Sequence, residues 1–458
     1  MTTDFSRFKL DPALLANLES LGYLQMTPIQ VEALPHVLAG RDLIAKAKTG
    51  SGKTVAFGLG LLERLNLQSF AVQALVLCPT RELADQVAKE LRRLARASAN
   101  TKVVTLCGGA PFGPQLASLE HGAHIVVGTP GRILKHLQKE TLTLHRVQVV
   151  VLDEADRMLD MGFHDDMVEI LAATPPRRQT LFFSATYPEQ FSELSSTFQR
   201  DPVEVSVESA HSESTIRQLF YEVESGNRAK ALAALLAEFR PASTVVFCHT
   251  RQQCQEVNEE LRQRGVQSLA LHGDLEQKER DLVLVRFANR SVPVLVATDV
   301  AARGLDIKEL EAVINYELPR DPEIYVHRIG RTGRAGSTGL ALSLFAPSEA
   351  QRINAIEAYQ NNKAQLMPLP TLTQGEFSLP APMVTLCIDG GRKEKVRPGD
   401  ILGALTADKT VTADKVGKID LFDHVAYVAI ERTQQAKALQ ILSEGSIKGR
   451  RFKVRALK

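Results

Sequence analysis

Short apolar runs alternate with longer helical patterns along most of this chain, and the alternation occurs twice. Apolar strands separated by helices are typical of parallel sheets that helices cover on both faces. The first set of predicted strands comprises residues 42–45, 74–78, 103–106, 125–128, 147–152 and 180–184. The second set comprises residues 244–248, 268–271, 294–298, 312–316 and 340–345. The chain is therefore predicted to contain two α/β domains, each built around a parallel sheet.

Two breaks divide the chain further. The polar stretch 204–217 contains several serines, and the stretch 367–382 is interrupted repeatedly by proline. Both are predicted to be linkers. The predicted organisation is a first α/β domain at 1–205, a linker at 206–217, a second α/β domain at 218–366, a linker at 367–382 and a small domain at 383–458.

The composition is that of a soluble globular protein, with 44% hydrophobic and 24% charged residues. No apolar stretch is long enough to span a bilayer, and the N-terminus lacks the hydrophobic core of a signal peptide. We therefore expect a cytoplasmic protein. The five cysteines are scattered and include no C-x-x-C pair, so they are predicted to be buried, reduced thiols.

The sequence AKTGSGKT, residues 47–54, follows a predicted strand and precedes a helical run. In such a loop successive backbone N–H groups cradle phosphates at a helix N-terminus. Lys53 would reach the β and γ phosphates, and the Thr54 hydroxyl would bind Mg²⁺. The other candidate nucleotide-binding residues of this loop are Thr49, Gly50, Ser51 and Gly52. Ala47 replaces the first glycine of the usual pattern, and a glycine-rich turn without a ligand is the alternative.

A second motif, VVVLDEAD, is acidic and ends a predicted strand with Asp153 and Glu154. Open α/β sheets bind ligands at the carboxyl ends of their strands. Asp153 could hold Mg²⁺ there, and Glu154 could orient the water that attacks the γ-phosphate. Alone, the pair could simply cap a helix. Together with the phosphate-binding loop, it predicts a nucleoside triphosphatase site.

The second predicted domain contains HRIGRTGR, which spaces Arg328, Arg331 and Arg334 three residues apart. Arginine suits the charge that develops on a transferring phosphoryl group. These residues could supply an arginine finger if the two domains close on one nucleotide. A solvated basic face is the alternative.

Residues 153–156 read DEAD, and the surrounding motifs resemble those of DEAD-box RNA helicases, in order, over residues 5–360. The resemblance implies two RecA-like domains that use ATP and Mg²⁺. Within GYLQMTPIQ it implies that Gln30 hydrogen-bonds adenine and that Tyr23 packs on its ring, with Phe5 at the upstream aromatic position.

The same resemblance implies further roles. The residues implied to line the RNA face of the first domain are Pro79, Thr80, Arg81, Gly108, Gly109, Thr129 and Arg132. The motif SAT, residues 184–186, would couple the ATP site to RNA. The second domain would grip the strand through Gln277, Arg280 and Thr298. Near the nucleotide it would place Gly304 and Asp306, with Arg331 and Arg334 on the γ-phosphate. Without base-reading aromatics, binding by these two domains should be independent of sequence.

Residues 383–458 are predicted to form a β-α-β-β-α-β domain, an order that fits an RRM-like fold. This segment carries 15 Lys and Arg against 9 Asp and Glu, which indicates a polyanionic partner. Alternation in HVAYVAI leaves Tyr427 as the single aromatic on the exposed face, where it could stack on RNA or be a half-buried sheet residue. The basic candidates for RNA binding are Lys393, Lys395, Arg450, Arg451 and Lys453.

A DEAD-box core with this kind of tail resembles the DbpA group of bacterial helicases. The resemblance implies that the tail recognises a hairpin of the large-subunit (23S) ribosomal RNA in pre-ribosomal particles, so that the protein acts in ribosome assembly, with a monomer expected. A flexible linker would then tether the core beside a duplex and raise its local RNA concentration. Two alternatives stay open: an ATP-gated RNA clamp that never separates strands, and a DNA helicase.

Overall fold

The computed structural model describes residues 4–47, 51–98, 100–184, 186, 189–207, 216–302, 310–333, 338–371 and 378–457. One compact unit lies within residues 1–210 and another within residues 211–458. No helix in the described ranges is both long and apolar enough to cross a membrane. All five cysteines are buried and unpaired by disulfides, as predicted.

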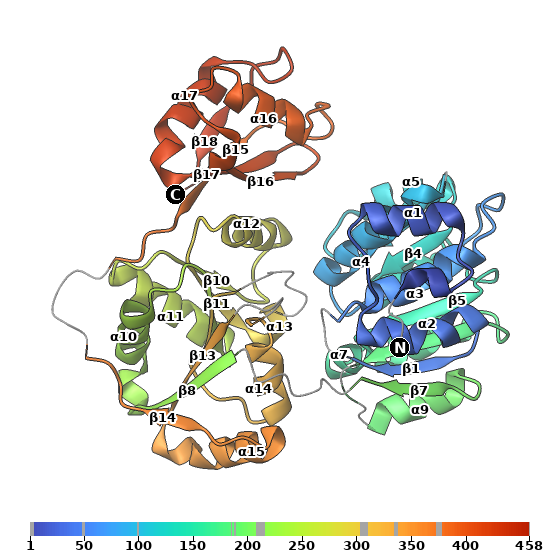
Figure 1. The fold of residues 1–458 in the computed structure, drawn as a ribbon, viewed down its shortest axis with the longest axis horizontal. Helices are drawn as coiled ribbons and strands as arrows, with labels where there is room; N and C mark the ends of the chain where they lie inside the picture. The colour runs from blue at the N-terminus through green and yellow to red at the C-terminus, as the bar shows by residue number, and fades with distance from the viewer. Residues whose placement is uncertain are drawn as a thin grey trace. The chain divides into compact units, whose positions relative to one another are not determined.

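The first unit is built on a seven-stranded parallel sheet in the order β3-β4-β2-β5-β6-β1-β7 (Figure 1). Its strands are β1 (Leu43–Lys46), β2 (Ala74–Leu77), β3 (Val103–Leu106), β4 (Ile125–Gly128), β5 (Val149–Asp153), β6 (Gln179–Ser184) and β7 (Val203–Ser206). Alternate residues of the strands enter two separate apolar clusters, so Val150 and Val151 lie in different ones. Both faces are therefore buried, as continuous apolar strands require.

Helices supply the other half of each cluster. They are α1 (Pro12–Ser20), α2 (Pro28–Ala39), α3 (Lys53–Arg64), α4 (Arg81–Leu94), α5 (Phe112–Glu120), α6 (Pro130–Gln138), α7 (Ala155–Asp160), α8 (His164–Ala172) and α9 (Glu189–Phe198). In α4, Leu83, Val87, Leu91 and Leu94 recur at helical spacing and are buried. The Thr80 hydroxyl accepts a hydrogen bond from Leu83 N at 3.3 Å and so caps the first turn.

The second unit contains a similar parallel sheet in the order β10-β11-β9-β12-β13-β8-β14. Its strands are β8 (Ile216–Glu222), β9 (Thr244–Cys248), β10 (Ser268–Leu271), β11 (Val294–Thr298), β12 (Ala312–Asn315), β13 (Gly339–Phe345) and β14 (Gln365–Met367). Its helices are α10 (Arg228–Phe239), α11 (Arg251–Gln263), α12 (Gln277–Ala288), α13 (Asp299–Ala302), α14 (Pro322–Ile329) and α15 (Ala350–Gln360).

A small C-terminal domain completes the second unit (Figure 1). Its antiparallel sheet has the order β16-β17-β15-β18. The strands are β15 (Met383–Ile388), β16 (Val416–Leu421), β17 (Ala426–Glu431) and β18 (Val454–Ala456), with helices α16 (Pro398–Thr406) and α17 (Gln435–Glu444). One sheet face packs under the helices through Leu386, Ile388, Val428 and Ile430. The predicted fold class, two parallel α/β domains and an α+β tail, is confirmed.

The predicted linkers are shorter than expected. β7 pairs with β1 inside the stretch 204–217, and β8 begins at Ile216, so the prediction of a linker from Glu204 to Arg217 is wrong at both ends. Residues 208–215 lie outside the described ranges. At the second break, Met367 still belongs to β14, and Leu379 pairs with Val266 of the second domain. Backbone pairing outweighs the polar or proline-rich composition at these positions.

The second face of the tail sheet is also covered, contrary to the expectation of an exposed face. Thr385 and Cys387 are fully buried there, and Tyr427 is half-buried. The alternation itself is as predicted, since Ala426, Val428 and Ile430 enter the tail core while Tyr427 does not.

Candidate active site

The motif loops of the first domain all follow the carboxyl ends of strands in one sheet. The loops implied to bind RNA follow β3, β4 and β2, which are consecutive neighbours at one side. The predicted nucleotide motifs follow β5 and β1 at the other side, and the SAT motif lies at the end of β6 between them. Because the strands are parallel, their carboxyl ends meet at one edge of the sheet. The strand order thus places the two predicted sets of binding loops on neighbouring parts of a single edge.

The phosphate-binding loop ends at the N-terminus of α3. Gly52 is the N-cap residue of this helix, with φ 95°. A side chain at Gly52 would be strained in that conformation and would meet the Gln30 amide nitrogen at 2.5 Å. The following residue, Lys53, is buried, and its Nζ lies 3.6 Å from Oδ1 of Asp153. Thr49 and Gly50 lie outside the described residues.

Asp153 ends β5 and is only 2% exposed. Burial raises its pKa to about 6, and the charge of Lys53 opposes that rise. Within the described part of the chain, Asp153 Oδ1 accepts no hydrogen bond although it is fully buried. A buried carboxylate oxygen with spare acceptor capacity suits a Mg²⁺ ligand at a phosphate site, where waters and phosphates supply most of the other ligands. The half-buried Thr54 follows Lys53 in the chain and would supply a hydroxyl.

Glu154 caps α7 in the left-handed region, with φ 57° and ψ 52°. This conformation costs roughly 1–3 kcal/mol for a residue other than glycine, so the surroundings must hold it. Arg157 does so, because its NH1 donates to Glu154 Oε2 at 2.8 Å and both side chains are buried. Arg157 was not among the predicted site residues, although its i,i+3 spacing from Glu154 on a helix was the available signal.

The last aspartate of the DEAD sequence links two motifs directly. Asp156 Oδ2 accepts hydrogen bonds from the backbone N and the hydroxyl of Thr186, at 3.0 and 3.1 Å. Ser184 Oγ accepts from Asp156 N at 3.2 Å and donates to Thr186 O at 2.7 Å. The strand end that carries Asp153 and the SAT motif are therefore joined by hydrogen bonds between buried and half-buried groups, which suits a coupling role.

The residues implied to read adenine surround the start of α2. The Gln30 side chain is buried, accepts from Thr27 N at 2.9 Å and donates to Gly52 O at 3.0 Å, so it ties this segment to the phosphate-binding loop. Tyr23 donates to Glu90 at 2.7 Å, and burial raises its pKa to about 12. Phe5 is buried in the core of the domain. Adenine contacts for these residues stay predictions.

The first-domain residues implied to bind RNA lie in short turns that follow strands. Arg81 begins α4 and pairs with Asp85 at 3.8 Å, directly after Pro79 and Thr80. Thr129 begins α6. Gly108 N donates to Thr129 Oγ1 at 3.5 Å. Arg132 donates to the Gln115 side chain and to Ala110 O, both at 2.9 Å. Gly109 is exposed and has a φ of 73°.

In the second domain α12 and the end of β11 lie together. Arg280 NH2 donates to Ala301 O at 2.7 Å, which joins α12 to α13, the short helix that follows Thr298. Gln277 Nε2 donates to Asp281 at 2.8 Å. The structure thus places Gln277, Arg280 and Thr298 on neighbouring elements, consistent with a shared strand-binding surface.

Two of the three spaced arginines, Arg328 and Arg331, lie within the described residues, and both are buried. Arg328 is 2% exposed and makes a bidentate pair with Asp299, at 2.7 and 2.8 Å. Its NH1 also donates to Asn315 and to the carbonyl of Glu317, at 3.0 and 2.9 Å. These contacts join Arg328 of α14 to β12 and to the start of α13, which indicates a structural role. Arg331 is 9% exposed, and Arg334, Gly304 and Asp306 lie outside the described residues.

Two basic segments of the tail, 391–397 and 448–453, lie side by side. Lys448 Nζ donates to Lys395 O at 3.3 Å, and Asp389 N donates to Lys453 O at 3.0 Å. Within them the predicted residues Lys393, Lys395, Arg450, Arg451 and Lys453 are all exposed. Residues separated by about fifty positions in the chain therefore form one basic surface.

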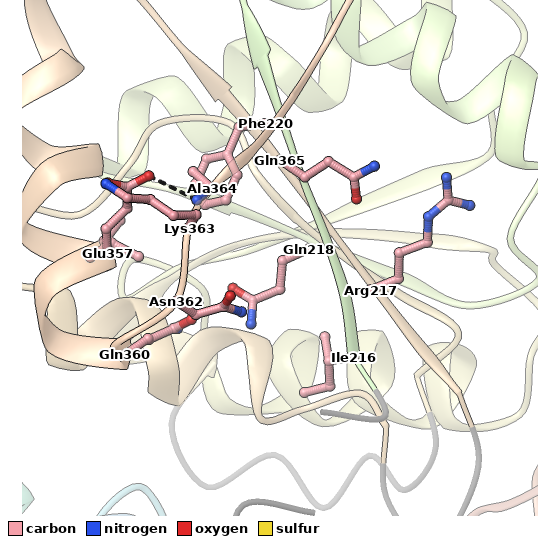
Figure 2. A pocket seen from close by; sticks show the side chains of 11 residues that line it. Ile216, Arg217, Gln218, Phe220, Glu357, Gln360, Asn362, Lys363, Ala364 and Gln365 are labelled. Atoms are coloured by element: carbon pink, nitrogen blue, oxygen red, sulfur yellow. Dashed lines mark hydrogen bonds and ion pairs between the residues drawn. The ribbon is translucent and has the colours of Figure 1, made fainter. Parts of the chain in front are cut away.

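A hollow of about 320 Å³ lies on the edge of the second-domain sheet, lined from β8, α15 and the approach to β14 (Figure 2). Arg217, Gln218, Asn362 and Lys363 are among its lining residues, and Ala364 N donates to Glu357 at 2.8 Å. The described lining includes none of the motif residues. The candidate active site is therefore the strand edge of the first domain rather than this hollow.

Comparison with known proteins places these motifs in families. Residues 27–194 match the DEAD/DEAH box helicase family, residues 227–336 match the helicase conserved C-terminal domain, and residues 385–456 match the DbpA RNA binding domain.

Individual relatives agree. The chain is 54% identical over 449 residues to the ATP-dependent RNA helicase DbpA of Escherichia coli, covering 98% of each chain. It is 42% identical over 375 residues to the DEAD-box ATP-dependent RNA helicase CshA of Bacillus subtilis, covering 82% of this chain and 76% of that one. The structure of S. cerevisiae Dbp5 bound to RNA and ADP BeF3 matches with a TM-score of 0.73 at 29% identity, covering 80% of this chain and 96% of that one.

Proposed function

This chain belongs to the DbpA group of DEAD-box ATP-dependent RNA helicases, and from that premise we propose that it separates short RNA duplexes beside a hairpin of the large-subunit (23S) ribosomal RNA. The tail would select this RNA, and the two α/β domains would use ATP to open the neighbouring duplex. The activity would serve assembly of the large ribosomal subunit.

The observation that carries the RNA assignment is the basic surface formed by segments 391–397 and 448–453. Each segment contributes four lysines or arginines, and the two share one acidic residue, Glu394. A compact surface of this kind suits a folded RNA whose phosphates approach from several directions, because phosphate contacts fix position while shape supplies selectivity. The outer face of the tail sheet is covered and is therefore not open for base stacking. Binding of RNA through the basic segments needs no such stacking, which supports the same choice.

We assign the chemistry to the first domain and the arginines of the second. Lys53 and the loop before α3 would hold the phosphates of ATP, and Glu154 would orient the attacking water. Asp153 and Thr54 would hold Mg²⁺, which would supply positive charge against the phosphates. Arg331 and Arg334 would contact the γ-phosphate. The bonds between Asp156 and Thr186 would relay this state to the RNA-binding loops.

Steady-state ATP hydrolysis by the intact protein tests the substrate, with 23S ribosomal RNA and with random RNA as stimulants. We expect half-maximal stimulation at a lower concentration of ribosomal RNA. Replacing Arg450 and Arg451 by glutamate should remove this preference. The control is Lys409→Glu with Lys437→Glu, which makes the same charge change at exposed positions outside the basic segments. Equal stimulation of the wild type by both RNAs would contradict the ribosomal assignment.

A strand-displacement assay separates a helicase from a clamp. The RNA carries a short duplex beside the preferred fragment, and release of the labelled strand is followed with ATP. A clamp would bind RNA in the presence of ATP and release no strand. We expect release that depends on hydrolysis.

A further inference from the structure

The outer face of the tail sheet packs against the second α/β domain. Thr385 and Cys387 of β15 and Ala429 of β17 point away from the tail core, yet they are between 0 and 1% exposed. The half-buried Tyr427 lies on the same face. Burial is the main cause that raises the pKa of Tyr427, and the carboxylate of Asp281 on α12 contributes to the same rise. This is the face on which RRM-like sheets ordinarily stack bases.

Buried polar groups fix the contact. Thr385 Oγ1 donates to Ser291 Oγ at 2.8 Å and accepts from Asn289 Nδ2 at 3.3 Å. The Met383 backbone N donates to Arg290 O at 3.3 Å. Asn289, Ser291 and Thr385 are between 0 and 7% exposed. Hydrogen bonds between buried groups favour one arrangement strongly, because any sliding of the two surfaces leaves polar groups unpaired.

The connection to the tail is also held. Leu379 packs in the core of the second domain and pairs with Val266. Arg432 of the tail donates through Nε to Ala381 O at 2.6 Å and through NH2 to Gln267 at 3.3 Å. Residues 379–383 are therefore attached to the second domain on one side and to the tail on the other. The sequence predicted a flexible tether at this point. The described residues form a held connection instead.

Helix α12 joins this contact to the predicted RNA-gripping surface. Gln277 and Arg280 lie in its first turn, and Asn289 is its C-cap residue. Twelve residues at about 1.5 Å each make the helix about 18 Å long. One rigid element thus separates the strand-gripping residues from the residue that holds the tail.

We propose that Thr385, Ser291 and Asn289 are positioning residues that hold the tail in one orientation on α12, so that RNA bound by the tail presents a duplex to the core at a fixed spacing. The inference rests on the proposed function, since it needs RNA bound by the tail. Unwinding should then depend on the number of nucleotides between the tail-bound RNA and the duplex. The helix length corresponds to roughly five nucleotides at about 3.4 Å each, which sets the scale of that dependence.

The test uses Thr385→Lys in the full chain. A lysine there places a charge in the contact but lies on the side of β15 away from the tail core. Thr410→Lys is the matched control, because Thr410 is exposed in the same domain. Thr385→Val keeps the shape and removes only the hydroxyl, so its effect should have the same direction and be smaller.

The first readout is the distance between spin labels at Gln252→Cys and Ser443→Cys, both exposed positions, in protein whose native cysteines are buried. We expect one narrow distance distribution for the wild type and Thr410→Lys, and a broad one for Thr385→Lys. A broad distribution in the wild type would overturn the proposal without any RNA.

The second readout is the unwinding rate against spacer length. The probe is the shortest 23S fragment that the protein prefers in the hydrolysis assay, joined to a duplex through unpaired uridines. For the wild type the rate should fall about fivefold or more when the spacer changes by about five nucleotides, since a rigid spacer that does not fit prevents simultaneous binding. Thr385→Lys should flatten this profile to less than about twofold while maximal RNA-stimulated hydrolysis is kept. An unchanged profile in that variant would refute the inference, whereas the absence of any preferred fragment would refute the proposed function instead.

Discussion

Replacing Arg328 by methionine tests whether this arginine is structural or catalytic. Methionine keeps the unbranched apolar stem and removes the guanidinium, whose four hydrogen bonds reach Asp299, Asn315 and the Glu317 carbonyl. Removing one partner of a buried ion pair costs about 3–5 kcal/mol, because the other charge is left without compensation. The Asp299 side chain is 24% exposed, so water can solvate it in part. We therefore expect a loss of about 3 kcal/mol in the second domain, the lower end of that range.

Hydrogen exchange of second-domain peptides is the suitable assay. The chain lacks tryptophan, and its domains need not unfold together, so a single melting curve would mix several transitions. Arg251→Met is the control. Arg251 pairs with Asp274 on the surface of the same domain, where the two side chains are 63% and 56% exposed, and its loss should cost less than about 1 kcal/mol. An arginine finger would lower hydrolysis without lowering stability. A stability loss below about 1 kcal/mol together with abolished hydrolysis would refute the structural role.

Three further predictions concern the first domain. Glu154→Gln should keep ATP-dependent RNA binding and slow hydrolysis by about 10²–10⁴-fold, and undiminished turnover would remove Glu154 from the mechanism. Thr186→Val removes the hydroxyl bond to Asp156 and keeps the backbone bond, so unwinding should fall more than RNA-stimulated hydrolysis; equal losses in the two assays would argue against coupling through this pair. Burial raises the pKa of Asp153 to about 6, so the folded state without ligand binds a proton there more tightly than the unfolded state does. Acidification from about pH 7 to 5 should therefore stabilise the wild type relative to Asp153→Asn. A stability difference between the two proteins that stays constant with pH would contradict this reasoning.

Much of the fold could be predicted because apolar runs bounded by helices are a strong signal. The eleven predicted strands of the α/β domains all occur, with ends shifted by at most two residues. The strands β7, β8 and β14 were missed. Each depends on pairing with a distant neighbour rather than on its own pattern: β7 reads VEVS, β8 begins in a polar stretch, and β14 has three residues beside a proline.

The site was predictable where a motif fixes both residue type and strand end, as at Lys53 and Asp153. The site was less predictable where the role of a residue depends on the residues around it. Spacing alone could not show that Arg328 is buried against Asp299. Alternation assigned the faces of β17 correctly, but alternation carries no information on what covers a face, and the contact of Thr385 with Ser291 joins residues 94 positions apart.

The division of the first sheet into two neighbouring sets of loops has an evolutionary consequence. Within the sheet, the strands β3, β4 and β2 meet the strands β5, β6 and β1 only where β2 pairs with β5. During evolution the nucleic-acid substrate could therefore change while the nucleotide that is hydrolysed stays the same. Loop grafting between relatives of different specificity would follow the same boundary, with Leu77 and its strand partner Leu152 marking where a donor segment should stop.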